Sequence, residues 1–142
     1  LNLTQVPIEI NVFHYGPGAW LGPHADLMDK LVTHVLYFNK KWRSKDGGCL
    51  QILRSQDSED VAAEINPTVG NSVVIVRSES SWHSVGRVRD GISLSRRSAT
   101  VTFYRPGSIS TMWPPGEDPV LHNCYNGNAH SGFLKRIRER FL

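Results

Sequence analysis

Three residues of this sequence could together hold a metal ion. His24 and Asp26 are separated by a single residue, and His83 follows much later in the chain. On an extended chain, side chains two residues apart point to the same side, so His24 and Asp26 can reach one ion. Two imidazoles and one carboxylate form the facial triad of non-haem Fe(II) oxygenases, which leaves coordination positions open for a co-substrate and O2. The pattern predicts that His24, Asp26 and His83 are metal ligands at a catalytic centre.

The strands that must position these residues follow from the alternation of apolar and polar residues. Residues 8–13 alternate in this way, and further strands are predicted at 31–39, at 49–54, at 72–77, around His83 and at 97–104, with a surface loop at 55–63. Many short strands separated by turn signals predict an all-β sandwich or barrel, for which a jelly roll is one solution. The spacing of Phe133, Ile137 and Phe141 adds a short C-terminal amphipathic helix, which we expect to pack on the sheet.

Short patterns such as H-x-D recur by chance, so the alternative is a surface aspartate and two ordinary histidines. Each candidate ligand lies beside a predicted strand, and an arginine follows on the next one, which favours the metal site. Arg97 shares its strand face with apolar residues, whereas Arg96 shares the more polar face. Because a barrel interior is mostly apolar, we expect Arg97 to point inward.

A buried guanidinium needs an anionic partner, and its planar fork suits a carboxylate. No acidic residue of the same strand supplies one. We therefore expect Arg97 to bind the carboxylate of a ligand, with a further hydrogen bond from Tyr37. Alternation puts Tyr37 on the inward face of the second strand together with Thr33 and Val35. The alternative partner of Arg97 is a structural aspartate or glutamate elsewhere in the fold.

Composition narrows the class of protein. With 142 residues, 39% of them apolar and without a long apolar run, we expect one domain over residues 1–142 and no membrane span. Two cysteines, Cys49 and Cys124, do not make a disulfide framework, so a cytoplasmic location is the default. The net charge of +3 could attract nucleic acid, but no basic stripe interleaved with aromatic residues is present. We therefore expect neither a membrane nor a nucleic acid as partner, and the oligomeric state stays open.

From Tyr15 to Tyr104 the sequence resembles the Fe(II)- and 2-oxoglutarate-dependent dioxygenases, in particular their prolyl-hydroxylase-domain (prolyl 4-hydroxylase) branch. The likeness is carried by an ordered series of segments, which is far more specific than the triad alone. The segments are YGPG at 15–18, HAD at 24–26, THVLYFN at 33–39 with Trp42, GGCL at 47–50, INP at 65–67, WHSV at 82–85 and RSATVTFY at 97–104.

The resemblance implies a double-stranded β-helix (jelly roll) with minor helical additions, and Fe(II) held by His24, Asp26 and His83. Arg97 and Tyr37 then resemble the pair that grips the distal carboxylate of 2-oxoglutarate, and Tyr15 resembles a residue at the edge of that pocket. Enzymes of this kind use O2 to decarboxylate 2-oxoglutarate to succinate and CO2 while they hydroxylate an unactivated C–H bond; ascorbate is a further candidate cofactor. An aspartate at position 26 favours hydroxylation, since halogenating relatives lack this carboxylate.

The resemblance leaves the substrate open. The segment between Asp26 and the second strand is short, which indicates a reduced substrate lid, so the substrate is either a prolyl or other residue in a peptide or a small molecule. Trp20, Trp82 and Arg77 either line its entrance or pack the structure. The connection that leads to Arg97 is longer than is usual in this branch, so the strand face, not the spacing, selects the arginine.

The helices that usually precede the first strand have no counterpart, which indicates a chain trimmed at its N-terminus. Two other interpretations stay open. One is a non-catalytic jelly-roll module that binds a metal or ligand, and the other is a nucleic-acid demethylase of the same superfamily.

Overall fold

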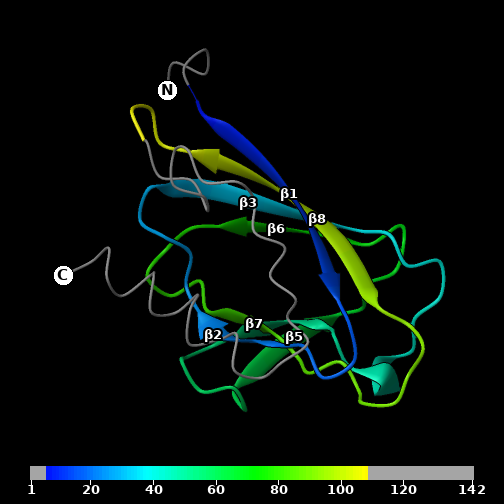
Figure 1. Cartoon of the computed structure of the whole chain (residues 1–142). Coiled ribbons are helices and arrows are strands. Elements are labelled where there is room, and N and C mark those ends of the chain that lie inside the picture. The colour runs from blue at the N-terminus through cyan, green and yellow to red at the C-terminus, as the bar shows by residue number, and fades with distance from the viewer. Residues whose placement is uncertain (1–5, 109–142) are drawn as a thin grey trace.

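The computed structural model describes residues 6–108, which form two antiparallel β-sheets packed face to face (Figure 1). The first sheet has the order β1 (Ile8–Tyr15), β8 (Arg96–Tyr104), β3 (Lys30–Tyr37) and β6 (Ser72–Val76). The second has the order β2 (Leu21–His24), β7 (His83–Val85), β4 (Leu50–Leu53) and β5 (Val61–Ile65). A single turn of 3-10 helix, η2 (Ser44–Asp46), lies between β3 and β4. The predicted jelly roll is confirmed.

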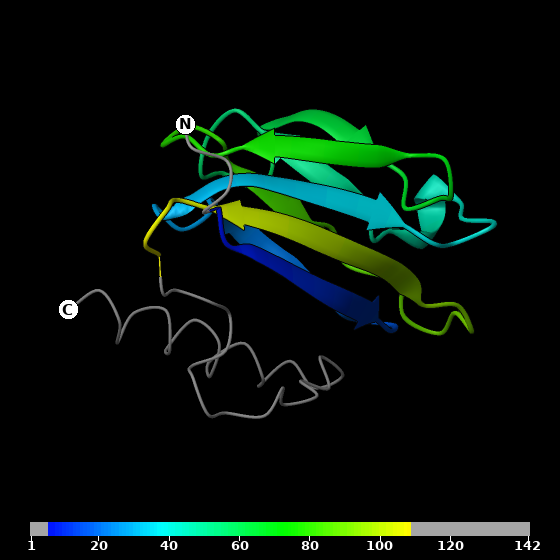
Figure 2. The same ribbon diagram turned by 90° about the horizontal axis from the view of Figure 1, so that it is seen from above.

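The chain passes from one sheet to the other at every connection except the one between β4 and β5. Figure 2 shows the first sheet in front of the strands of the second. Because of these crossings, strands that are neighbours in space are distant in sequence, as β8 is from both β1 and β3. The topology therefore brings residues from widely separated parts of the chain into the space between the sheets.

Two strands were not anticipated, and both are edges of the second sheet. β2 contains Gly22 and Pro23, which are poor strand formers, and proline in a sheet is largely confined to edge strands. β5 begins at Val61, inside the segment 55–63 that was predicted as a loop; its middle residues are exposed. The predicted helix at Phe133–Phe141 lies outside the described residues. Within residues 6–108 no helix is long and apolar enough to cross a membrane.

The core lies between the two sheets and is built from both. Its buried members are Tyr15, Ala19, Val35, Tyr37, Trp42, Leu50, Ile75, Val85 and Val88. The outer face of the first sheet is apolar as well, although it is exposed among the described residues: Ile8, Ile10 and Val12 on β1 are 57%, 67% and 79% exposed. Apolar residues thus occur on both faces of this sheet, and alternation alone does not tell which face is inward.

Loops close the end of the sandwich at which β1 finishes. Val88 is fully buried there and exchanges backbone hydrogen bonds with Gly18 (2.8 Å) and Ala19 (2.9 Å). Gly47 packs against the same loop with φ of 70°, and a Cβ at this position would overlap the carbonyl oxygen of Arg87. The glycines of the YGPG and GGCL segments therefore allow three loops to pack together beside Arg96, the first residue of β8.

Candidate metal and co-substrate site

His24 and His83 face each other across the β2–β7 pair. They are direct partners in its antiparallel register, and their ring centroids are 4.2 Å apart. Directly opposed residues of an antiparallel pair have the shortest separation between side chains on one face. The unanticipated strand β2 is therefore the element that brings the first predicted ligand to the third.

Hydrogen bonds to the backbone set the tautomer of both rings. Nδ1 of His24 lies 2.9 Å from the carbonyl oxygen of Gly22, and Nδ1 of His83 lies 2.9 Å from that of Ser81. A carbonyl oxygen only accepts, so each Nδ1 donates the hydrogen bond, and in the neutral form of each ring the lone pair available to a metal is on Nε2. Burial, followed by the neighbouring His83, lowers the pKa of His24 from 6.5 to about 4, so this ring is neutral at pH 7.

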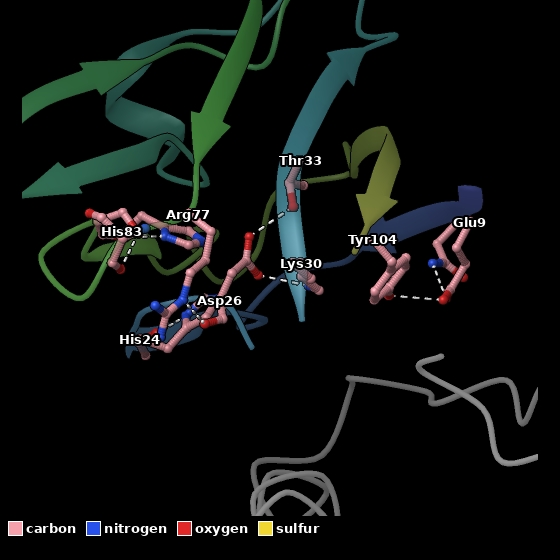
Figure 3. Close-up of polar contacts among 12 residues, drawn as sticks. Glu9, His24, Asp26, Lys30, Thr33, Arg77, His83 and Tyr104 are labelled. Carbon is pink, nitrogen blue, oxygen red and sulfur yellow. Dashed lines mark hydrogen bonds and ion pairs between the residues drawn. The ribbon is translucent and has the colours of Figure 1, made fainter. Parts of the chain in front are cut away.

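Asp26 is buried and is held by contacts to the first sheet (Figure 3). Lys30 donates to Oδ1 at 2.7 Å, Thr33 donates to Oδ2 at 2.8 Å, and Nε of Arg77 donates to the backbone oxygen at 3.3 Å. Burial acts to raise the pKa of this carboxyl, but Lys30, with further help from His83 and Thr33, outweighs it and lowers the pKa. Asp26 is therefore ionised at neutral pH.

The three side chains meet at one point. Each of His24, Asp26 and His83 offers a ligand atom, and these atoms all lie within 4.8 Å of one another. Two imidazoles whose Nδ1 atoms are bonded to the backbone and one ionised carboxylate are ligand types that suit a divalent ion. The residues therefore fit a metal of the facial-triad type.

The prediction that Arg97 points inward is wrong, because β8 has the opposite register. Arg96 is 2% exposed, whereas Arg97 is exposed on the outer face. The inward face of β8 is the more polar one: it carries Ser98, Thr102 and Tyr104, all buried, and Tyr104 donates a hydrogen bond of 3.0 Å to Glu9 of β1 (Figure 3). The rule that the apolar face is inward fails here because this part of the sandwich interior is polar.

Arg96 lies between two tyrosines. Its guanidinium carbon is 5.2 Å from the ring centroid of Tyr15 and 5.3 Å from that of Tyr37, which are cation–π distances. Nη1 donates to the hydroxyl of Ser98 at 2.8 Å. Tyr37 faces inward as predicted and is 3% exposed. Burial raises the pKa of its hydroxyl despite the opposing influence of Arg96.

Two polar atoms of this cluster lack a hydrogen-bond partner among residues 6–108. They are Nε of Arg96 and the hydroxyl of Tyr37, both fully shielded from solvent. Within the same residues Arg96 also has no salt bridge to a carboxylate. A buried cation and two orphaned donors are costly unless a ligand satisfies them. The cluster therefore fits an anionic group, such as one carboxylate of 2-oxoglutarate.

The two parts of the site lie along one strand. Thr33, which contacts Asp26, and Tyr37, which contacts Arg96, are both on the inward face of β3 with Val35 between them. Four residues of strand correspond to about 13 Å. The candidate metal ligands and the Arg96 cluster therefore lie at two positions along the inward face of β3.

The residues expected at a substrate entrance are separated by the structure. Trp82 lines a cleft of about 180 Å³ that also reaches His83. Trp20 lines a different cleft of about 470 Å³, which contains none of the three candidate ligands. Arg77 contacts Asp26 directly. Trp82 and Arg77 therefore lie at the candidate centre, whereas Trp20 does not.

Sequence reasoning missed three residues of the site. Arg96 could have been found from the polar alternation of β8, which continues through Ser98 and Thr102. Thr33 was placed on the inward face with Tyr37, but nothing in the sequence pointed to its bond with Asp26. Lys30 had no signal at all, because an irregularity in the β3–β8 pairing falls between Lys30 and Val32.

Comparison with known proteins identifies relatives. Residues 10–105 match the family model of the 2OG-Fe(II) oxygenase superfamily. A crystal structure of a Pseudomonas putida prolyl-4-hydroxylase is similar with a TM-score of 0.59 and 29% identity, over 75% of this chain and 56% of that one. A prolyl 4-hydroxylase structure from Phytophthora capsici has a TM-score of 0.48 and 18% identity, over 95% of this chain and 43% of that one. The chain thus spans little more than half of the Pseudomonas enzyme. No curated protein gives a significant match.

Proposed function

Since this chain belongs to the 2OG-Fe(II) oxygenase superfamily, we propose that it is a hydroxylase of aliphatic C–H bonds that uses Fe(II), 2-oxoglutarate and O2. His24, Asp26 and His83 would hold Fe(II), and Arg96 with Tyr37 would hold the distal carboxylate of 2-oxoglutarate. The observation that carries the proposal is the meeting of three ligand atoms within 4.8 Å, with both imidazoles presenting Nε2.

In this proposal the side chains of the protein would bind and orient Fe(II) and 2-oxoglutarate. Bound Fe(II) supplies the oxidation of 2-oxoglutarate by O2 to succinate and CO2, coupled to hydroxylation. Asp26 supplies the one negative charge of the ligand set, and its presence favours transfer of a hydroxyl group over halogenation. Arg96 would attract the distal carboxylate of 2-oxoglutarate by its positive charge. The guanidinium is shielded from water, and an interaction between charges is stronger there than at the surface. The rings of Tyr15 and Tyr37 keep the guanidinium in place.

A prolyl residue in a peptide is the first substrate to test, because the similar Pseudomonas protein is described as a prolyl-4-hydroxylase. Another peptidyl residue, a free amino acid or a small metabolite are the alternatives. In this proposal the substrate reaches the metal through the cleft of about 180 Å³ that Trp82 and His83 line.

The test is succinate formation from 2-oxoglutarate under air, by the wild type and by His83→Ala, with and without Fe(II). We expect iron-dependent succinate in the wild type, increased by a prolyl peptide if that is the substrate. Loss of one of three ligands should abolish both Fe(II) binding and turnover in the variant.

His34→Ala is a matched control, because His34 lies on β3 outside the triad. Turnover by His83→Ala near the wild-type rate would exclude this metal site. A wild type that binds Fe(II) or 2-oxoglutarate but forms no succinate would instead support the non-catalytic binding module.

A further inference from the structure

The two oxygens of the Asp26 carboxylate are both occupied by donors from β3. Lys30 forms an ion pair with Oδ1 at 2.7 Å, in which the side chains of Lys30 and Asp26 are 14% and 6% exposed. Thr33, itself buried, donates to Oδ2 at 2.8 Å. Charge-assisted bonds of this length to both oxygens fix the rotation of a carboxylate about its side-chain bonds. Asp26 is therefore oriented by the protein before any metal binds.

A β-bulge makes the two contacts compatible. Side chains alternate along a regular strand, so Lys30 would point outward with Val32 and His34 while Thr33 points inward. In the β3–β8 register, however, Lys30 pairs with Tyr104 and Val32 pairs with Phe103, so Leu31 is an extra residue. A bulge re-aims the neighbouring side chains and occurs often beside active sites. Here it places Lys30 on the same side of β3 as Thr33, where both reach Asp26.

We propose that Lys30 and Thr33 are positioning residues, which hold Asp26 in the orientation that binds the metal and keep it a ligand through one oxygen. The inference rests on the proposed metal site of His24, Asp26 and His83. Because Asp26 follows β2 of the second sheet while Lys30 and Thr33 belong to the first, the pair also ties the ligand to the sheet that carries Arg96.

The experiment measures Co(II) binding to the whole chain under nitrogen, by calorimetry and by the visible absorption of the bound ion. Thr33→Val removes one hydroxyl without a change of charge. We expect Co(II) affinity to fall about 10-fold to 100-fold, as for other residues that orient metal ligands, with altered absorption bands. Thr33→Ser keeps the hydroxyl and should restore both affinity and spectrum, which a purely structural role of the threonine would not predict.

Lys30→Gln gives an independent measurement. Loss of a positive charge would by itself strengthen the binding of a divalent cation. Weaker Co(II) binding by this variant, which we also expect, therefore reports lost positioning. Thr68→Val, which removes a hydroxyl bonded to Asn71 outside the site, and Lys41→Gln, an exposed lysine, are the controls and should leave binding within about twofold of wild type.

Two results would overturn the proposal. Co(II) affinity and spectrum of folded Thr33→Val and Lys30→Gln equal to those of the wild type would show that the contacts do not position the ligand, while the metal site itself stands. A wild type that binds no Co(II) would remove the metal site and the positioning role together.

Discussion

At the scale of single residues, two adjacent arginines offer a test of the co-substrate site. Arg96→Ala removes the buried guanidinium between Tyr15 and Tyr37, whereas Arg97→Ala changes an exposed side chain. Hydrogen bonds to a charged group contribute about 1.5–3 kcal/mol, so the KM for 2-oxoglutarate should rise about 10-fold to 100-fold in the first variant. Steady-state kinetics with varied 2-oxoglutarate measures this.

The neighbouring arginine is the control for this prediction. Arg97→Ala should leave the KM for 2-oxoglutarate within about twofold of wild type, and both variants should retain Co(II) binding, because neither residue touches the triad. A large rise of KM in Arg97→Ala alone would show that Arg97 binds the carboxylate, as the sequence predicted, and would contradict the register of β8.

Removal of the Tyr37 hydroxyl should affect the stability of the fold and the binding of 2-oxoglutarate differently. The hydroxyl is buried without a hydrogen-bond partner among the described residues, a situation that costs about 1–3 kcal/mol. Tyr37→Phe should therefore leave the free energy of unfolding unchanged or raise it, while the KM for 2-oxoglutarate increases about 2-fold to 10-fold through loss of one hydrogen bond. Urea unfolding and steady-state kinetics measure the two effects. A less stable variant with an unchanged KM would show that the hydroxyl stabilises the fold and does not bind 2-oxoglutarate.

At the scale of elements, the strands of the first sheet could be predicted from their alternation, and the direction of their faces only in part. Thr33, Val35 and Tyr37 of β3 were assigned to the inward face, and all three are buried. On β8 the same reasoning chose the wrong face. The outer face there is apolar too, while the inner face carries buried polar side chains. Burial of apolar residues decides the face of a strand only where the interior is itself apolar.

Other features could not be predicted because they depend on distant parts of the chain. β2 is held in extended form by its pairing with β7, although Gly22 and Pro23 disfavour a strand. Lys30 reaches Asp26 because β8 imposes a bulge on β3. His24, Asp26 and His83 could be singled out from the sequence, because their residue types are those of a metal-ligand set, and the structure brings their side chains together. Their role as metal ligands stays a prediction. The contacts that orient these ligands are tertiary and leave no local pattern.

At the scale of the whole molecule, the candidate site joins the two sheets. His24 and His83 belong to the second sheet, Asp26 is tied to β3 of the first, and Arg96 lies on β8 of the first. The ligand atoms come together only when both sheets are formed and packed. Metal and 2-oxoglutarate should therefore bind the folded chain and not the unfolded one, so their binding should stabilise the fold as a unit.

Thermal unfolding under nitrogen with Mn(II) and 2-oxoglutarate tests this coupling without turnover. A ligand at 100 times its Kd adds about 2.7 kcal/mol, and each kcal/mol raises the Tm of a small domain by about 2–8 °C, so a shift on the order of 10 °C is expected. A chelator should reverse it. His83→Ala should lose the shift caused by Mn(II), whereas His34→Ala should keep it, since His34 lies outside the triad. An equal shift in His83→Ala would show that the metal binds elsewhere on the chain. The stabilisation would then not come from a site that joins the two sheets.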